Sequence, residues 1–256
     1  MKKYILNQCS WKTIKEEKFG MALLPWGATE PHNYHLPYGT DTLQSEKIAE
    51  LVADKAYTNG VKCMVLPSIP LGVQNPGQVD YPFCLHTRPT TQRAILQDIL
   101  AALDRQGIHK VIIINSHGGN GFKPFIRELQ VQFEHCFIGV IDWFNVMNNE
   151  DYFDEPGDHA GEMETSVMQF CYPELVLPLE EAGEGKATGF KLAGLNSKLV
   201  WTPRNWGKIS NDTGVGNPRK ASANKGRLFL DDLTNSIMEF LMELDKVGPM
   251  DIYQKR

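Results

Sequence analysis

A three-layer α/β/α fold, with helices on both faces of a central, mostly parallel sheet, is predicted by three features of this sequence. Short apolar segments alternate with longer segments whose apolar residues recur every three or four positions. That repeated strand–helix order is typical of parallel strands joined by helical crossovers. The chain has 256 residues and no internal repeat or clear linker, so we expect one domain over residues 1–256.

Four short apolar segments are expected to form the strands of this sheet. MALLPW at residues 21–26 is the first, and VKCMVLP at 61–67 is the second. KVIIIN at 110–115 is the clearest strand in the chain, and CFIGVID at 136–142 is the last. Because these segments are apolar throughout rather than alternating, they favour strands that are buried on both faces of the sheet.

Helices are expected where the apolar residues share one helix face. In residues 41–60, Ile48, Val52 and Ala56 have that spacing, and Asn59-Gly60 is a common signal for a helix end. Further helices are expected at residues 90–106, 122–134, 159–171 and 223–245. Long irregular loops, rich in Gly with Pro or Asn, are expected at residues 68–89 and 180–220.

Charge and cysteine content exclude several classes of protein. The net charge is −5 and the basic residues are scattered, which argues against a nucleic-acid partner. The apolar runs are too short for a membrane span or a signal peptide, so no membrane association is expected. Five dispersed cysteines without a CxxC pair favour reduced thiols and a cytoplasmic location; they are Cys9, Cys63, Cys84, Cys136 and Cys171.

The loop ATEPHNYHLPYGTDT, residues 28–42, combines Glu30, His32, His35 and Asp41. Carboxylate oxygens and imidazole nitrogens without thiolates suit Zn²⁺, Mn²⁺ or Fe²⁺, and one carboxylate can bridge two ions. The alternative is structural, because Asp41 could cap the following helix and the histidines could bond within the loop. Spacing alone does not decide between the two interpretations.

Two further segments carry potential site residues. In NSHGGN, residues 115–120, His117 lies between a buried strand and a Gly pair, where the backbone must approach something closely. DHAGEMETS, residues 158–166, offers a histidine and three acids, although acids are also common in the first turn of a helix. These residues are Asp158, His159, Glu162 and Glu164.

All three segments follow predicted strands, so they should meet at one edge of the sheet. In open α/β sheets, ligands bind beyond the carboxyl ends of the strands. Cys84 and His86 are a weaker candidate pair for nucleophilic catalysis, because no third group is evident to orient them. Neither a GxGxxG nor a GxxxxGK[ST] motif is present to indicate a nucleotide site.

The three segments together resemble the creatininase (creatinine amidohydrolase) family. The matching stretches are LLPWGATEPHNYHLPYGTDT, NSHGGN and HAGEMETS, in the family's order and within residues 23–166. The resemblance implies the family's α/β/α fold and a dinuclear metal centre, with Zn²⁺ expected first and Mn²⁺ or Fe²⁺ as alternatives. It also implies a homo-oligomer, with hexamers common in the family.

The resemblance also implies roles for individual residues. Glu30 and His32 would each bind one ion, Asp41 would bridge both ions, and His117 would join the ion held by Glu30. Creatininases complete the second ion with a Glu two residues after that histidine, but this chain has Gly119 there. Glu164 is therefore the expected replacement, with Glu162 as the second choice. His159 matches a catalytic histidine, Asp158 takes the place of a neighbouring acid, and His35 matches a residue beside the ligands.

The expected activity is hydrolysis of a non-peptide C–N amide bond, in a cyclic amide or a formamide of a small molecule. The departure at Gly119 puts creatinine itself in doubt as the substrate. A creatinine amidohydrolase proper, a peptide-cleaving family member and a catalytically silent metal-binding protein remain alternatives.

Overall fold

A computed structural model describes residues 2–254. Its main sheet has the strand order β2-β1-β3-β4, and every neighbouring pair is parallel. The strands are β1 (Met21–Trp26), β2 (Cys63–Val65), β3 (Lys110–Asn115) and β4 (Phe137–Asp142). The strands expected at 61–67 and 136–142 are therefore present but shorter, and the other two match.

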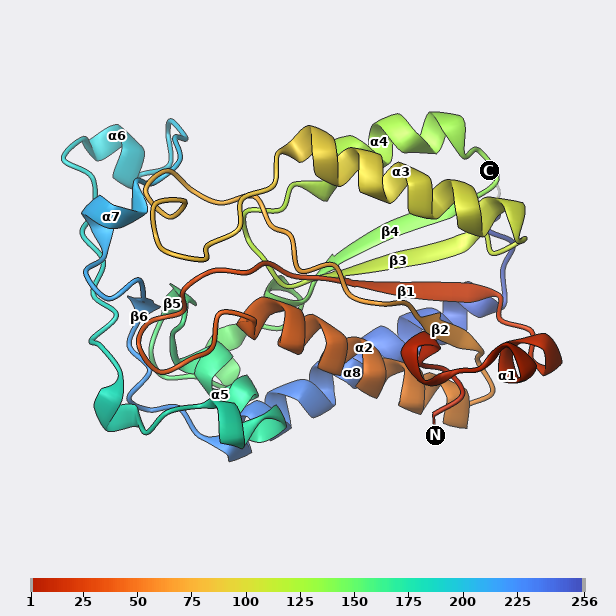
Figure 1. Ribbon diagram of the computed structural model, residues 1–256, viewed down its shortest axis with the longest axis horizontal. Helices are drawn as coiled ribbons and strands as arrows, with labels where there is room; N and C mark the ends of the chain where they lie inside the picture. The colour runs from red at the N-terminus through yellow and green to blue at the C-terminus, as the bar shows by residue number, and fades with distance from the viewer. Residues whose placement is uncertain (1, 255–256) are drawn as a thin grey trace.

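Helices cover both faces of this sheet, so the three-layer α/β/α prediction is confirmed (Figure 1). One layer contains α2 (Thr40–Thr58), α5 (Glu162–Cys171) and α8 (Ala223–Asp245), and the other contains α3 (Pro89–Arg105) and α4 (Phe122–Gln132). Short helices are α1 (Trp11–Glu16), α6 (Ala193–Asn196) and α7 (Trp206–Ile209). The 3₁₀ turns are η1 (Leu6–Gln8), η2 (Trp143–Asn145), η3 (Asn149–Asp151), η4 (Pro173–Leu175) and η5 (Leu179–Glu181).

The central strands are buried on both faces because their side chains alternate between two separate cores. Leu23 and Ile112 point into the core beneath α2 and α8, whereas Leu24 and Ile113 point into the core beneath α3 and α4. All four side chains are fully or almost fully buried. The continuous apolar runs in the sequence are explained by this burial on both faces.

One predicted helix begins later than expected. Residues 159–171 were expected to be helical, but α5 begins at Glu162, and residues Gly157–His159 form the short strand β5. Strand β5 pairs antiparallel with β6 (Val215–Gly216), from the region expected to be irregular. Ala160, with φ of 51°, lies between the strand and the helix. The periodicity could not show this break, because the pairing partner lies more than fifty residues further along the chain.

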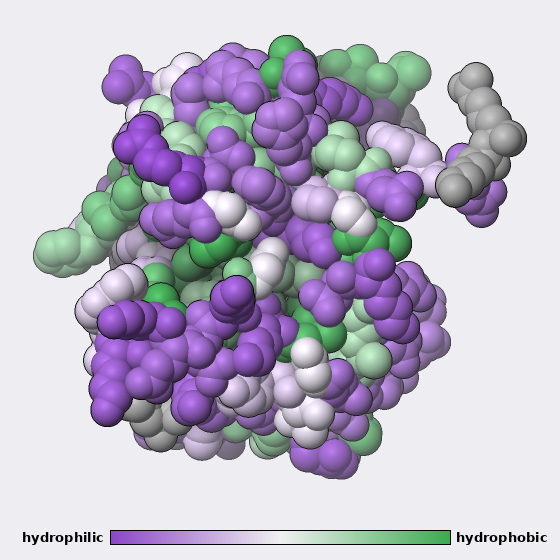
Figure 2. All heavy atoms as spheres, turned by 90° about the vertical axis from the view of Figure 1, so that its right-hand side faces the viewer, coloured by the Kyte–Doolittle hydropathy of each residue, from purple (hydrophilic) through white to green (hydrophobic). Residues whose placement is uncertain are grey.

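Hydrophilic residues predominate on the face shown in Figure 2. Among residues 2–254, no helix is both long enough and apolar enough to cross a membrane.

Candidate metal centre

Six buried polar side chains meet beyond the carboxyl ends of β1 and β3, beside the start of α5. They come from the loop after β1, the first turn of α2, the loop after β3, strand β5 and the first turn of α5. Each is at least nine-tenths buried; they are Glu30, His32, Asp41, His117, His159 and Glu164. The sheet edge predicted from the sequence is therefore the place where these residues gather.

Three overlapping groups of these side chains offer atoms that lie within 4.8 Å of one another. Glu30, Asp41 and His117 form one group, and His32, Asp41 and Glu164 form a second. Asp41 belongs to both, which is the arrangement a bridging carboxylate requires. A third group combines Glu30 and His32 with His159.

The three histidines share one feature of orientation. His32 Nδ1 lies 3.0 Å from the carbonyl oxygen of Glu30, His117 Nε2 lies 2.9 Å from that of Val73, and His159 Nε2 lies 2.9 Å from that of Pro31. Because a carbonyl oxygen only accepts, each of these nitrogens must carry the proton and donate it. The other nitrogen of each ring is then directed into the cluster, as a metal-ligating imidazole requires.

Short separations between the inward nitrogens and the carboxylates call for positive charge. His32 Nε2 lies 3.0 Å from Asp41 Oδ1, and His117 Nδ1 lies 3.1 Å from both Asp41 Oδ2 and Glu30 Oε1. A neutral ring would place its lone pair against an oxygen lone pair at these distances. Either a proton or a metal cation must therefore lie between each nitrogen and its carboxylate.

In two of the carboxylates, as in the histidines, one polar atom is held by a donor from outside the cluster. Gln78 donates from Nε2 to Glu30 Oε2, which leaves Oε1 directed at the histidines. The backbone N–H of Ala160 donates to Glu164 Oε2. Among the described residues, the buried Asp41 Oδ2 has no hydrogen-bond donor unless His117 Nδ1, 3.1 Å away, is protonated, as expected of an oxygen that binds a cation.

The pKa shifts follow from burial and from these short contacts. Burial alone would lower the pKa of His32, but the Asp41 carboxylate outweighs it and raises the pKa to about 10. The pKa of His117 is likewise raised against burial, chiefly by Glu30. For Asp41, burial opposes ionisation, yet the two histidines hold its pKa well below its ordinary value.

The pKa of Glu164 is raised, unlike that of Asp41, and the pKa of His159 is lowered, unlike that of His32. Burial raises the pKa of Glu164 to about 7, and burial followed by repulsion from His32 lowers the pKa of His159. Within the described residues, no Lys or Arg forms an ion pair with Glu30, Asp41 or Glu164. Three buried carboxylates without a fixed cation, facing three imidazoles, fit one or two divalent ions.

The NSHGGN turn holds His117 by a network of amide bonds. Asn115 accepts from the backbone N–H of His117 and donates to its carbonyl oxygen, and Asn120 donates to Asn115. A Cβ atom at Gly119 would collide with the carbonyl oxygen of Val73 and lie 2.6 Å from His117 Nε2. Glycine at this position therefore permits the bond between Val73 and His117, and a Glu would disrupt it.

Asp158 and Glu162 lie outside the cluster. The Asp158 carboxylate is half exposed and lies 2.8 Å from the Arg204 guanidinium. Glu162 is buried on the opposite side of α5, where it pairs with Lys225 and accepts backbone N–H bonds from residues 154 and 155. Glu162, the second choice for the second ion, is thus absent from every ligand group of the described residues, whereas Glu164 is present.

Three other sequence candidates are held by structural contacts. His35 Nε2 lies 2.8 Å from Thr165 Oγ1, one residue beyond Glu164. Burial raises the pKa of Cys84 to about 12, which is the reverse of what a thiolate nucleophile needs, and His86 accepts from a backbone N–H.

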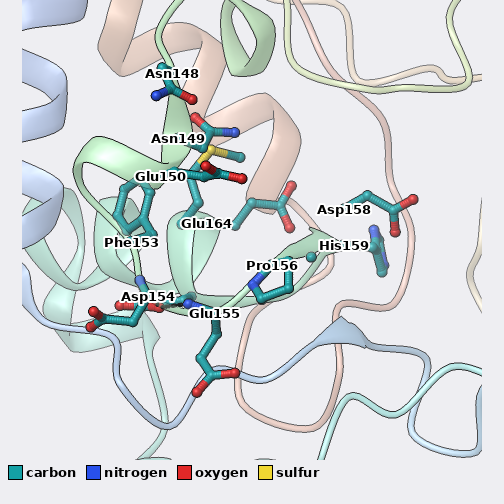
Figure 3. Close-up of a pocket in the computed structure, with 14 residues that line it drawn as sticks. Asn148, Asn149, Glu150, Phe153, Asp154, Glu155, Pro156, Asp158, His159 and Glu164 are labelled. Carbon is teal, nitrogen blue, oxygen red and sulfur yellow. Dashed lines mark hydrogen bonds between the residues drawn. The ribbon is translucent and has the colours of Figure 1, made fainter.

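A cavity of about 640 Å³ adjoins the cluster. Figure 3 shows Glu150, Phe153 and Glu164 around it, with Asp158 and His159 at its other end. A small molecule in this space would lie against one residue of the second ligand group and against His159. Neither Glu150 nor Phe153 belongs to a recognisable motif, so neither could be predicted as a cavity residue.

Gln78 and Trp206 are the site residues that sequence reasoning missed. Gln78 lies in the Gly/Pro-rich loop after β2, and Trp206 lies in the region expected to be irregular. The Trp206 ring packs edge-to-face on His159 with 5.2 Å between ring centroids. A buried aromatic or amide side chain in an irregular loop is the general signal that could have drawn attention to both.

Comparisons with known proteins match most of the chain to one family. The family model described as "Creatininase: Creatinine amidohydrolase" matches residues 7–241. Creatinine amidohydrolase of Pseudomonas putida is 24% identical over 204 residues, covering 68% of this chain and 74% of the relative. The mycofactocin precursor peptide peptidase of Mycobacterium ulcerans (strain Agy99) is 26% identical over 162 residues, covering 60% of each chain.

Solved structures agree over almost the whole chain. A protein from Bacteroides fragilis NCTC 9343, provisionally assigned as a creatinine amidohydrolase, is 44% identical with a TM-score of 0.95, covering 99% of this chain and 100% of its own. A mutant creatininase of "Zn-Zn type" and a structure described as "Creatininase Mn" are each 21% identical with TM-scores of 0.79, covering 96% of this chain and 100% of theirs. At that identity they show the fold alone.

Proposed function

The chain belongs to the creatininase family, and on that premise we propose that it is a metal-dependent amidohydrolase with a dinuclear centre. Its substrate is a small molecule with a non-peptide C–N amide bond, in a cyclic amide or a formamide. Family membership bears out the expectation of a hydrolase acting on carbon–nitrogen bonds.

One observation carries the proposal of a metal centre. Each of three buried imidazoles donates one N–H to a backbone carbonyl and turns its other nitrogen toward carboxylates that no Lys or Arg of the described chain neutralises. A purely structural histidine cluster would not require three carboxylates without a Lys or Arg partner, each within 4.8 Å of an imidazole nitrogen. Two divalent ions would supply that missing charge.

We assign Glu30 and His117 to one ion, His32 and Glu164 to the other, and Asp41 to both. The assignment is supported by the two ligand groups that share Asp41. Zn²⁺ is expected first and Mn²⁺ or Fe²⁺ next, because nitrogen and oxygen donors without thiolates accept all three. Relatives of the same fold are described as Zn–Zn and Mn forms, which supports both metals as candidates.

Ions bound there would activate water and polarise the amide carbonyl near neutral pH. The protein's own part is proton transfer and positioning. With Nε2–H held by the Pro31 carbonyl, His159 has Nδ1 available, 3.5 Å from Glu30 Oε1 and facing the cluster. Nδ1 would take a proton from the attacking water and deliver it to the leaving nitrogen, so that the C–N bond breaks and amide and water become carboxylic acid and amine, which separate as carboxylate and protonated amine at neutral pH.

Creatinine is also a cyclic amide, but the departure at Gly119 makes us expect it to be a poor substrate. The close approach of Val73 to His117 over Gly119 leaves no space for the Glu that creatininases carry there, so the second ion has a different ligand set. The similarity to Pseudomonas putida creatinine amidohydrolase favours creatinine as an alternative substrate. The similarity to a precursor-peptide peptidase favours a peptide.

A direct test is turnover of creatinine, dihydrouracil, N-formylglycine and glycylglycine by the protein loaded with Zn²⁺ or Mn²⁺, with bound metal measured by elemental analysis. We expect close to two ions per chain and turnover of a cyclic amide or a formamide. Turnover of creatinine at the rate of a creatininase would refute the expectation that creatinine is a poor substrate. Two bound ions with no turnover of any amide would favour the catalytically silent alternative.

Assembly and location are part of the same proposal. We propose a homo-oligomer, with a hexamer expected from the family resemblance; sedimentation as a stable monomer at micromolar concentration would refute it. The five cysteines are all free, which supports the proposed cytoplasmic location.

A further inference from the structure

His159 is held on two sides by aromatic rings and at one ring nitrogen by the backbone. The His32 ring lies against it with 4.2 Å between centroids and an interplanar angle of 33°. The Trp206 ring lies on another side, at 5.2 Å and 85°. Because Nε2–H donates to the Pro31 carbonyl, a rotated ring would lose that bond and withdraw Nδ1 from the cluster.

Trp206 is itself fixed by three contacts from separate parts of the chain. It is 3% exposed, its indole N–H donates to the carbonyl oxygen of Thr213 at 2.9 Å, and its backbone N–H donates to that of Pro76 at 2.7 Å. The Arg204 guanidinium stacks on its ring at 4.8 Å. Two loops that are far apart in the sequence therefore set the place of this indole.

Arg204 connects this indole back to the residue beside His159. Its guanidinium lies 2.8 Å from Asp158 Oδ2 while it covers the Trp206 ring. Asp158 lies at an irregularity in the β5–β6 pairing and its side chain is half exposed, whereas the next residue, His159, is buried and faces the cluster. Asp158 therefore holds Arg204, and Arg204 covers the Trp206 ring. That ring in turn packs against His159.

We propose that Trp206, fixed by Arg204 and Asp158, is the positioning residue that keeps His159 in its single Nε2–H tautomer with Nδ1 facing the proposed metal centre. Asp158 acts through Arg204 and has no direct part in the reaction. The inference deepens the proposed function and rests on it for the proton-transfer role of His159, whereas the ring orientation stands on geometry alone.

The first test measures the tautomer of the His159 ring. Long-range ¹H–¹⁵N NMR of histidine-labelled, zinc-loaded protein, with His159→Gln for assignment, should show the Nε2–H tautomer in the wild type. Trp206→Leu should mix the two tautomers, and Trp206→Phe, which retains an aromatic edge, should restore the wild-type pattern. Trp26→Phe is the matched control, because Trp26 is also buried and donates to a loop carbonyl, but it does not touch His159. An unchanged His159 signal in Trp206→Leu overturns the proposal.

The second test separates positioning from metal binding, with the amide that the wild type hydrolyses fastest in the panel above. Trp206→Leu should lower kcat by about 10-fold, the usual effect of losing an orienting group near a metal site, with KM within about twofold and zinc content unchanged. Trp206→Phe should recover most of kcat. Loss of an ion in Trp206→Leu overturns the proposal, because the indole would then support the ligands rather than His159.

The third test changes Arg204 and Asp158, whose side chains are partly exposed and can be altered with little risk to folding. Arg204→Met and Asp158→Asn should each lower kcat by about threefold, and the double variant should be no worse than either single variant. A 100-fold loss in Asp158→Asn alone would make Asp158 a direct participant and overturn the proposal. If the wild type binds no metal and cleaves no amide, the proposed function fails, yet the same tautomer measurement on the metal-free protein still tests the positioning of His159.

Discussion

Two segments supply most of the cluster, and they differ in how reliably neighbours in sequence become neighbours in space. In residues 28–41, after β1, Glu30, His32 and Asp41 all turn inward. In residues 157–164, only His159 and Glu164 do so, whereas Asp158 and Glu162 pair with arginine and lysine elsewhere.

The difference arises from the backbone of the two segments. The first leaves a strand buried on both faces and enters α2 at the same sheet edge, which brings Glu30, His32 and Asp41 together there. The second passes from a strand through Ala160, at φ of 51°, into a helix. Residues two apart in a helix point about 200° apart, so Glu162 and Glu164 must face different surroundings. Close spacing of ligand types therefore predicts a site only where the backbone direction is also known.

Asp41→Ala should have the largest effect, because it removes the carboxylate assigned to both ions. Two cations without a shared anion repel each other, so at least one ion and essentially all turnover should be lost. Elemental analysis and turnover in one buffer measure both. An Asp41→Ala protein that keeps two ions would show that residues 28–41 do not supply the bridging carboxylate.

His159→Ala should keep both ions and lower the rate by roughly 10²–10⁴-fold, the usual contribution of a positioned acid or base. His159 also belongs to one potential ligand group, so the metal content of this variant is the decisive number. If His159→Ala loses an ion while Asp41→Ala retains both, the roles assigned to the two segments are exchanged.

The matched pair Glu164→Gln and Glu162→Gln tests the second segment with one chemical change at positions two residues apart. Glu164→Gln should weaken one metal site by about 10–100-fold. Glu162→Gln should keep both ions but destabilise the fold by about 1–3 kcal/mol, because Lys225 and two backbone N–H groups lose a charged partner. Metal titration and thermal unfolding distinguish them. Metal loss in Glu162→Gln with none in Glu164→Gln would reverse the assignment.

The smallest expected effect is a pH dependence of metal stabilisation. The pKa of His32 is raised to about 10 in the metal-free site, so its protonation stabilises the metal-free fold fully below pH 6.5 and progressively less toward pH 10. Metal binding displaces that proton, so apparent affinity should rise by about tenfold per pH unit for each proton released. The Tm difference between zinc-loaded and metal-free protein should therefore widen from pH 6 to pH 8.5. A constant difference would show that His32 binds as a neutral ring without losing a proton.

The fold and the first ligand segment could be predicted because local patterns were sufficient for them. The continuous apolar runs of β1 and β3 determine burial on both faces, which makes a parallel sheet with two helical layers the natural solution. Glu30, His32, Asp41 and His117 follow those strands directly, so the topology alone brings them to one edge. The single domain and the roles of these residues stay predictions.

Only the tertiary structure decided which way the remaining side chains point. Strand β5 exists because it pairs with β6 more than fifty residues away, and that pairing turns His159 inward and Asp158 outward. Gln78 and Trp206 reach the cluster from loops whose sequence carries no periodicity, since their positions are set by hydrogen bonds to distant carbonyls and carboxylates. Sequence patterns record burial and local backbone preference, whereas the direction of a polar side chain depends on partners that only folding brings near.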